Sequence, residues 1–144
     1  MVIERLKETG WTFGSHTWGH IRLDSRPLES VQRDTVRWAE EVGSLVGPTN
    51  ILFYPHGGRP DGDDWHSTGP VFQYLQSQGF RIFASVGINS FSYIKKDISA
   101  VICDRLHPDG TTLRNGKALE WYSQFYDARE IIDLDVRPDL GVTW

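Results

Sequence analysis

The sequence predicts an α/β fold in which parallel strands are covered by outer helices. Apolar runs typical of buried strands alternate with amphipathic stretches of helical spacing along most of the 144 residues. A chain of this length fits one domain of ordinary size, so residues 1–144 are expected to form a single domain. In such folds the loops at the carboxyl ends of the strands build the functional site.

The composition excludes several classes of protein. Fifteen basic and nineteen acidic residues leave a net charge of −4 with no basic tail, which argues against a nucleic-acid binder. Cys103 is the single cysteine, so an intrachain disulfide and a cysteine-based zinc cluster are both excluded. No apolar run approaches the length of a membrane span, and early charged residues argue against a signal peptide. Aromatic residues make up 12% of the chain, which suits both a core and a sugar-binding cleft.

The first elements follow from apolar spacing. A helix is expected from the N-terminus to about Thr9-Gly10, followed by a short strand over residues 11–13. An apolar residue at every third or fourth position predicts a helix over residues 28–46, which Gly47-Pro48 stops. The continuous apolar run 51–54 is typical of a strand buried on both faces.

The later elements continue this alternation. A polar loop over residues 57–69 is long for a structureless connection, and such loops are often functional. Gly79 suits the left-handed end of the helix that precedes it. The predicted elements after the loop are a helix, two strands and a last helix, over residues 70–78, 80–86, 100–103 and 117–126.

Two histidines stand just after the first predicted strand. His16 and His20 are four residues apart, so they can point the same way, and neutral imidazole is a common ligand of zinc-like ions. Five histidines occur in the chain, so a pair with this separation also arises by chance. The spacing alone leaves both a metal site and a structural pair open. Thr17, between them, is expected to hold the loop by hydrogen bonding.

The residues around this pair resemble the polysaccharide deacetylases, the NodB-homology carbohydrate esterases. The motif His-Thr-x-x-His after Gly-x-x-x-Gly-Ser is similar to their metal-binding motif. The similarity thins after Gly116. It extends to five further stretches: residues 4–11, 28–46, 54–57, 78–80 and 104–110.

This resemblance implies an incomplete or distorted (β/α) barrel that removes acetyl groups from N-acetylated polysaccharide or peptidoglycan fragments. It implies a divalent metal, zinc in the first instance, with His16 and His20 as ligands. The metal polarises the acetamido carbonyl and lowers the pKa of its water. Pro55, His56 and Gly57 match the substrate-binding groove, where a backbone N–H can stabilise the oxyanion. Trp18 is expected to bind substrate as a sugar platform.

The chain also departs from the family pattern. The family has an Asp-Asp pair upstream of the histidine motif, whereas the first aspartate here is Asp24. The third metal ligand and the catalytic base are therefore missing, and we expect residues 1–144 to be the C-terminal portion of the domain with a weakly held metal. The arginine expected before the Pro-x-Gly loop aligns with Phe53. A late leucine-x-histidine motif is not recognisable. His107 is a weak candidate for an acid, since its surroundings indicate a turn.

Three functions remain open at this point. The chain is a metal-dependent de-N-acetylase that is inactive in isolation, a non-catalytic remnant of that fold that binds sugar or metal, or an unrelated α/β protein. The flanking similarity argues against the third. An unpaired edge at residues 11–13 and the apolar residues Val2, Ile3 and Leu6 lead us to expect a homodimer. Family members usually act on cell-wall or extracellular glycans, and the sequence does not assign a compartment to this chain.

Overall fold

The computed structural model describes residues 2–62, 69–86, 93–96, 99–105, 120 and 123–124. The chain divides into two compact units, Met1–Leu106 and His107–Trp144, and every element described below belongs to the first. His107 and most of the helix predicted over residues 117–126 lie outside the described residues. The single domain over residues 1–144 therefore stays a prediction.

The helices of the first unit agree with the predicted ones. The first helix, α1 (Val2–Glu8), ends before Gly10, whose φ of 88° is left-handed. Helix α2 (Leu28–Trp38) continues through a π-helical turn, η1 (Ala39–Gly43), into α3 (Ser44–Val46), and Gly47 ends the run with a φ of 89°. Helix α4 (Pro70–Ser77) ends before Gly79. Within the described residues, no helix is both long enough and apolar enough to cross a membrane.

The described strands form one open sheet in the order β1-β2-β4-β3. Strands β1 (Ile51–Phe53), β2 (Ile82–Val86) and β4 (Ala100–Arg105) are parallel, as predicted. Strand β3 (Tyr93–Lys95) was not predicted and pairs antiparallel with β4. The mixture of helices and parallel strands is thus confirmed, while closure into a barrel stays a prediction.

The strand predicted over residues 11–13 is wrong. The pairing in this region is a single parallel bridge between Ser15 and Leu52, with Ser15 N–H donating to the Ile51 carbonyl at 2.9 Å. The carbonyl of Phe13 instead accepts a hydrogen bond from the Thr49 hydroxyl at 2.7 Å, so a side chain takes the place of a ladder bond. The chain therefore joins β1 later than predicted, immediately before the histidine motif.

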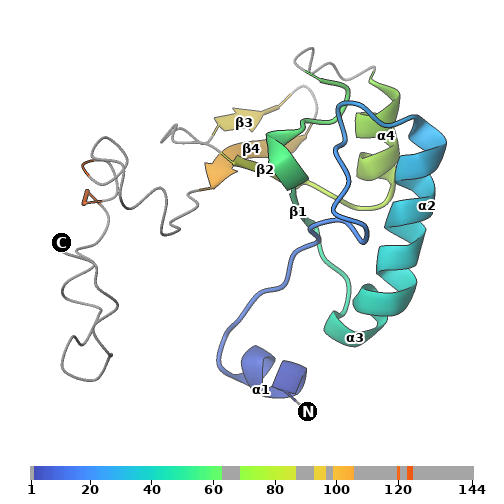
Figure 1. Ribbon diagram of the computed structural model, residues 1–144. Coiled ribbons are helices and arrows are strands. Elements are labelled where there is room, and N and C mark those ends of the chain that lie inside the picture. Colours follow the sequence, from blue (N-terminus) through green and yellow to red (C-terminus); the bar gives the residue numbers. More distant parts are fainter. Residues whose placement is uncertain are drawn as a thin grey trace, which may run out of the picture. The chain divides into compact units, whose positions relative to one another are not determined.

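The core lies between the sheet and helices α2 and α4, which pack side by side on one of its faces (Figure 1). Leu52, Phe83 and Ile102 form one row across β1, β2 and β4 and are buried against these helices. The prediction that β1 is buried on both faces is only half right, because Ile51 and Phe53 on its other face are partly exposed. Ala84, which lies in the same row as Phe53, is 2% exposed, so this other face of the sheet is also buried in part. Phe53 ends β1, and the candidate site lies at that end of the strand.

Candidate functional site

Three imidazoles meet at the carboxyl end of β1. The bridge at Ser15 places His16 beside this end, and a 3-10 turn, η2 (Pro55–Gly57), follows β1 after Tyr54. The ring centroids of His16 and His20 are 4.9 Å apart, and those of His20 and His56 are 4.5 Å apart. Two predicted metal ligands and one predicted groove residue are thus brought together from separate parts of the chain.

The orientation of the His16 ring is set by the backbone of β1. Its Nδ1 lies 2.9 Å from the carbonyl oxygen of Phe53. A carbonyl oxygen only accepts hydrogen bonds, so Nδ1 carries the proton and the Nε2 lone pair is free. Hydrogen bonds of this kind orient metal-ligating histidines in proteins.

The electrostatic surroundings of His16 favour the neutral form of its imidazole. Partial burial lowers the pKa of His16 below its ordinary value, and the hydrogen bond to Phe53 opposes that effect. The positive charge of Arg105 lowers the pKa further, as do the neighbouring rings of His20 and His56. Because only neutral imidazole binds a metal, this environment favours the ligating form.

The loop that carries the two histidines has an unusual backbone. Thr17 and His20 adopt left-handed φ values of 61° and 51°, and His56 has a φ of 56°. Such residues cost on the order of 1–3 kcal/mol each and persist only where their surroundings hold them. Thr17 contributes to this, since its hydroxyl accepts a hydrogen bond from the N–H of Ile21 at 3.2 Å. The predicted structural role of Thr17 is confirmed.

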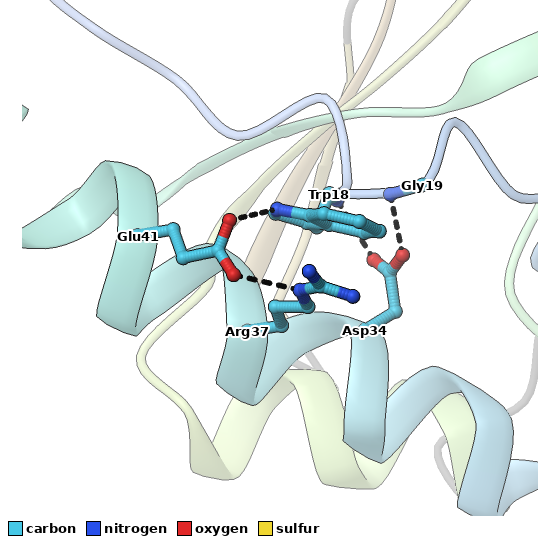
Figure 2. Close-up of polar contacts among 5 residues, drawn as sticks. All are labelled: Trp18, Gly19, Asp34, Arg37 and Glu41. Carbon is cyan, nitrogen blue, oxygen red and sulfur yellow. Dashed lines mark hydrogen bonds and ion pairs between the residues drawn. The ribbon is translucent and has the colours of Figure 1, made fainter.

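Trp18 projects from the same loop toward helix α2. Its Nε1 donates to Glu41 at 2.8 Å, and the guanidinium carbon of Arg37 lies 3.5 Å from its ring centroid (Figure 2). Arg37 also pairs with Glu41 at 2.7 Å. Trp18 is 40% exposed. Because Arg37 covers one face of the indole, any further group that stacks on Trp18 is confined to the opposite face.

The predicted groove residues differ in accessibility. Pro55 is buried, Gly57 is partly buried and His56 is exposed. Pro55 therefore shapes the turn, and the solvent-accessible surface of the turn belongs to His56 and Gly57. This distinction was not visible in the sequence, where the three residues formed one motif.

Arg105, at the end of β4, is a site residue that the sequence analysis missed. Its guanidinium carbon lies 5.7 Å from the ring centroid of Phe53, the position where the resemblance led us to expect an arginine. Its Nε is buried without a hydrogen-bond partner among the described residues. Burial lowers the pKa of Arg105. The β-sheet register places Arg105 here, so only the strand pairing could have revealed it.

The donors in this cluster fit the chemistry of a zinc-like cation only in part. His16 offers an oriented imidazole nitrogen, and His20 lies beside it. The described part of the chain, however, contains no group of three or more His, Cys, Asp or Glu side chains arranged to hold a metal ion. Zinc sites in proteins generally use at least three protein ligands. The described residues therefore offer at most a pair of protein ligands as they are arranged.

Comparison with known proteins identifies the family of this chain. A family model described as polysaccharide deacetylase matches residues 1–81, from α1 through the histidine loop, β1 and α4. No curated protein and no solved structure matches. The family match covers more than half of the chain and includes all three clustered histidines. The chain therefore belongs to the polysaccharide deacetylase family.

Proposed function

We propose that the chain is a carbohydrate de-N-acetylase domain in which His16 and His20 bind a divalent cation, zinc in the first instance. N-acetylated polysaccharide or peptidoglycan fragments are the proposed substrates. The observation that supports this most strongly is the imidazole cluster at the carboxyl end of β1, with His16 oriented by the Phe53 carbonyl.

Each residue of the cluster has a proposed task. His16 and His20 hold the cation, which when bound acts as a Lewis acid and lowers the pKa of water. His56 and Gly57 border the reacting group, and a backbone N–H of this turn donates to the acetamido oxygen as charge develops on it. The free face of Trp18 receives a sugar ring.

The same arrangement limits the activity of the 144-residue chain. No group of three potential ligands is arranged for a metal among the described residues, so none of the described carboxylates joins His16 and His20 as a third ligand. Losing a general base alone removes about 10²–10⁴-fold in rate. We therefore expect negligible turnover by this chain and weak metal binding. This observation also favours a second candidate, a non-catalytic domain that binds metal or sugar.

Metal binding is tested by calorimetric titration of the chain with zinc, cobalt and manganese. We expect weak binding that disappears in both His16→Ala and His20→Ala. The His56→Ala variant serves as the comparison, because His56 belongs to the cluster but not to the proposed ligand pair. Tight binding that survives both of the first two substitutions would place the metal elsewhere and overturn the proposal.

Acetate release from N-acetylchito-oligosaccharides and peptidoglycan fragments separates the two candidates. Little or no acetate with measurable sugar binding supports the non-catalytic domain. Slow release that depends on added metal and on His20 supports the de-N-acetylase. Robust turnover that His20→Ala abolishes would contradict the expected inactivity and would require a carboxylate from another part of the chain.

A further inference from the structure

A buried carboxylate on helix α2 holds the loop that carries the histidine motif. Asp34 is 8% exposed, and its two oxygens each accept a hydrogen bond from this loop. The N–H of Trp18 donates to Oδ1 at 2.9 Å, and the N–H of Gly19 donates to Oδ2 at 2.7 Å (Figure 2). Asp34 makes no ion pair with any residue that the structure describes. In the part of the chain that the structure describes, the two carboxylate oxygens of Asp34 therefore face two consecutive peptide groups between His16 and His20.

Glycine at position 19 allows this close approach. A Cβ atom built on Gly19 would lie 3.0 Å from Asp34 Oδ2, closer than about nine in ten real Cβ contacts. A side chain at this position would therefore require the carboxylate to shift by a few tenths of an ångström. The short distance between Gly19 N and Asp34 Oδ2 thus depends on both residues.

The same side of α2 and η1 also holds the side chain of the loop. Asp34, Arg37 and Glu41 are separated by three and four residues, which places them on one helical face. Asp34 binds the loop backbone, while Arg37 and Glu41 bind the indole of Trp18. All of these contacts act on Trp18 and Gly19. The residues on either side of this pair, Thr17 and His20, have left-handed backbones.

We propose that Asp34 is the positioning residue of the histidine cluster. By fixing the peptide groups of Trp18 and Gly19, it sets the backbone from which His20 projects toward His16 and His56. Asp34 touches neither the proposed metal nor a substrate. The catalytic meaning of this inference rests on the proposed function, but the positioning itself can be measured without turnover or metal.

The chain offers a matched control in Asp61. Its carboxylate also accepts hydrogen bonds from two consecutive backbone N–H groups, those of Val71 at 3.1 Å and Phe72 at 2.8 Å. These bonds hold the first turn of α4 and not the histidine loop. Asp61→Asn therefore measures how much stability is lost when a carboxylate contact of this kind is weakened. Asp34→Asn measures the same kind of loss together with any effect on the histidines.

The first experiment records the ring ¹H–¹⁵N correlations of the histidines in the metal-free chain, together with thermal unfolding. We expect both substitutions to lower the melting temperature, but only Asp34→Asn to shift the His20 ring signals. Gly19→Ala is the second variant, because it displaces the carboxylate and leaves its charge intact, and it should reproduce the His20 shift. Unchanged His20 signals in folded Asp34→Asn and Gly19→Ala proteins would overturn the positioning role.

The second experiment measures zinc binding by calorimetry in the same variants. Residues that orient metal ligands typically change metal affinity by about 10–100-fold, so we expect such a loss in Asp34→Asn and none in Asp61→Asn. Equal affinities in wild type and Asp34→Asn would contradict the inference. If wild type itself binds no metal, the proposed function fails, whereas the ring signals still decide whether Asp34 positions His20.

Discussion

His16 donates its Nδ1 hydrogen to the carbonyl oxygen of Phe53 at 2.9 Å, although the two residues are 37 positions apart. Because Phe53 is the last residue of β1, the direction of the imidazole depends on where that strand ends. A site residue in the N-terminal loop is thereby oriented by the sheet. The protonation of His16 is therefore sensitive to whether the loop and the sheet are assembled.

The lowered pKa of His16 predicts how stability depends on pH. Below the ordinary value of 6.5, the unfolded chain binds a proton at this residue more readily than the folded chain does. The contribution of His16 to stability is therefore complete above about pH 6.5 and is lost as the pH falls toward the lowered folded-state value. Urea unfolding between pH 5 and 7.5 measures this. His16→Asn, which keeps a donor toward Phe53 but does not titrate, should flatten the dependence.

Removing the charge of Arg105 should raise the pKa of His16. The guanidinium disfavours a second positive charge nearby, so Arg105→Gln is expected to move the His16 titration toward its ordinary value. NMR titration of the histidine ring protons measures the change. Arg81→Gln is the control, since Arg81 binds the carbonyls of Gln76 and Phe80 at the beginning of β2. Identical His16 titrations in wild type and Arg105→Gln would show that the two residues do not interact.

If the free face of Trp18 receives a sugar, Trp18→Ala should weaken binding of N-acetylchito-oligosaccharides. An anchoring tryptophan contributes more than about 1 kcal/mol, so a loss of about tenfold is expected. Trp18→Phe, which keeps an aromatic face but cannot donate to Glu41, should bind at an intermediate level. Trp11→Ala is the control, because Trp11 is exposed but lies near Asn50, before the start of β1. Chemical-shift titrations give the affinities, and equal losses in both alanine variants would exclude a specific platform.

The core between the sheet and its two helices should dominate stability. Leu52 is 1% exposed within that core, and Leu52→Ala is expected to lower the free energy of unfolding by about 2–5 kcal/mol. Leu45, which is 50% exposed, provides the matched control, and its replacement by alanine should change the value by less than about 0.5 kcal/mol. Denaturant unfolding measures both. Similar losses in the two variants would mean that the core is assigned incorrectly.

Self-association is expected from the apolar surface near the N-terminus. Val2 and Trp11 are highly exposed, and Trp11 and Phe13 border a hollow of about 580 Å³ with Val46 and Pro48. A stable homodimer would bury more than roughly 1,000 Å² in total. Light scattering at micromolar concentration should give about twice the 16.5 kDa of one chain. Trp11→Lys should shift the protein to monomer, and a monomeric wild type would contradict the expectation.

The sequence by itself determined the elements whose signals are local. Residues 28–46 form a continuous helical run because apolar side chains recur at the spacing of a helical face, and Gly47 ends that run. The apolar runs at β1, β2 and β4 likewise predicted parallel strands. The spacing of His16 and His20 identified the motif, and their family followed from the residues around it. Each of these features depends on residues a few positions apart.

The tertiary structure decided what depends on distant pairings. The bridge at Ser15, and not a strand over residues 11–13, places the histidine loop, because the Thr49 hydroxyl takes the carbonyl of Phe13. The order and register of the parallel strands bring distant residues together. They place His56 beside His20, and Arg105 near the ring of Phe53. Asp34 reads in the sequence as one polar residue of an amphipathic helix. Only the packing of that helix against the loop turns it into the acceptor of two backbone N–H groups.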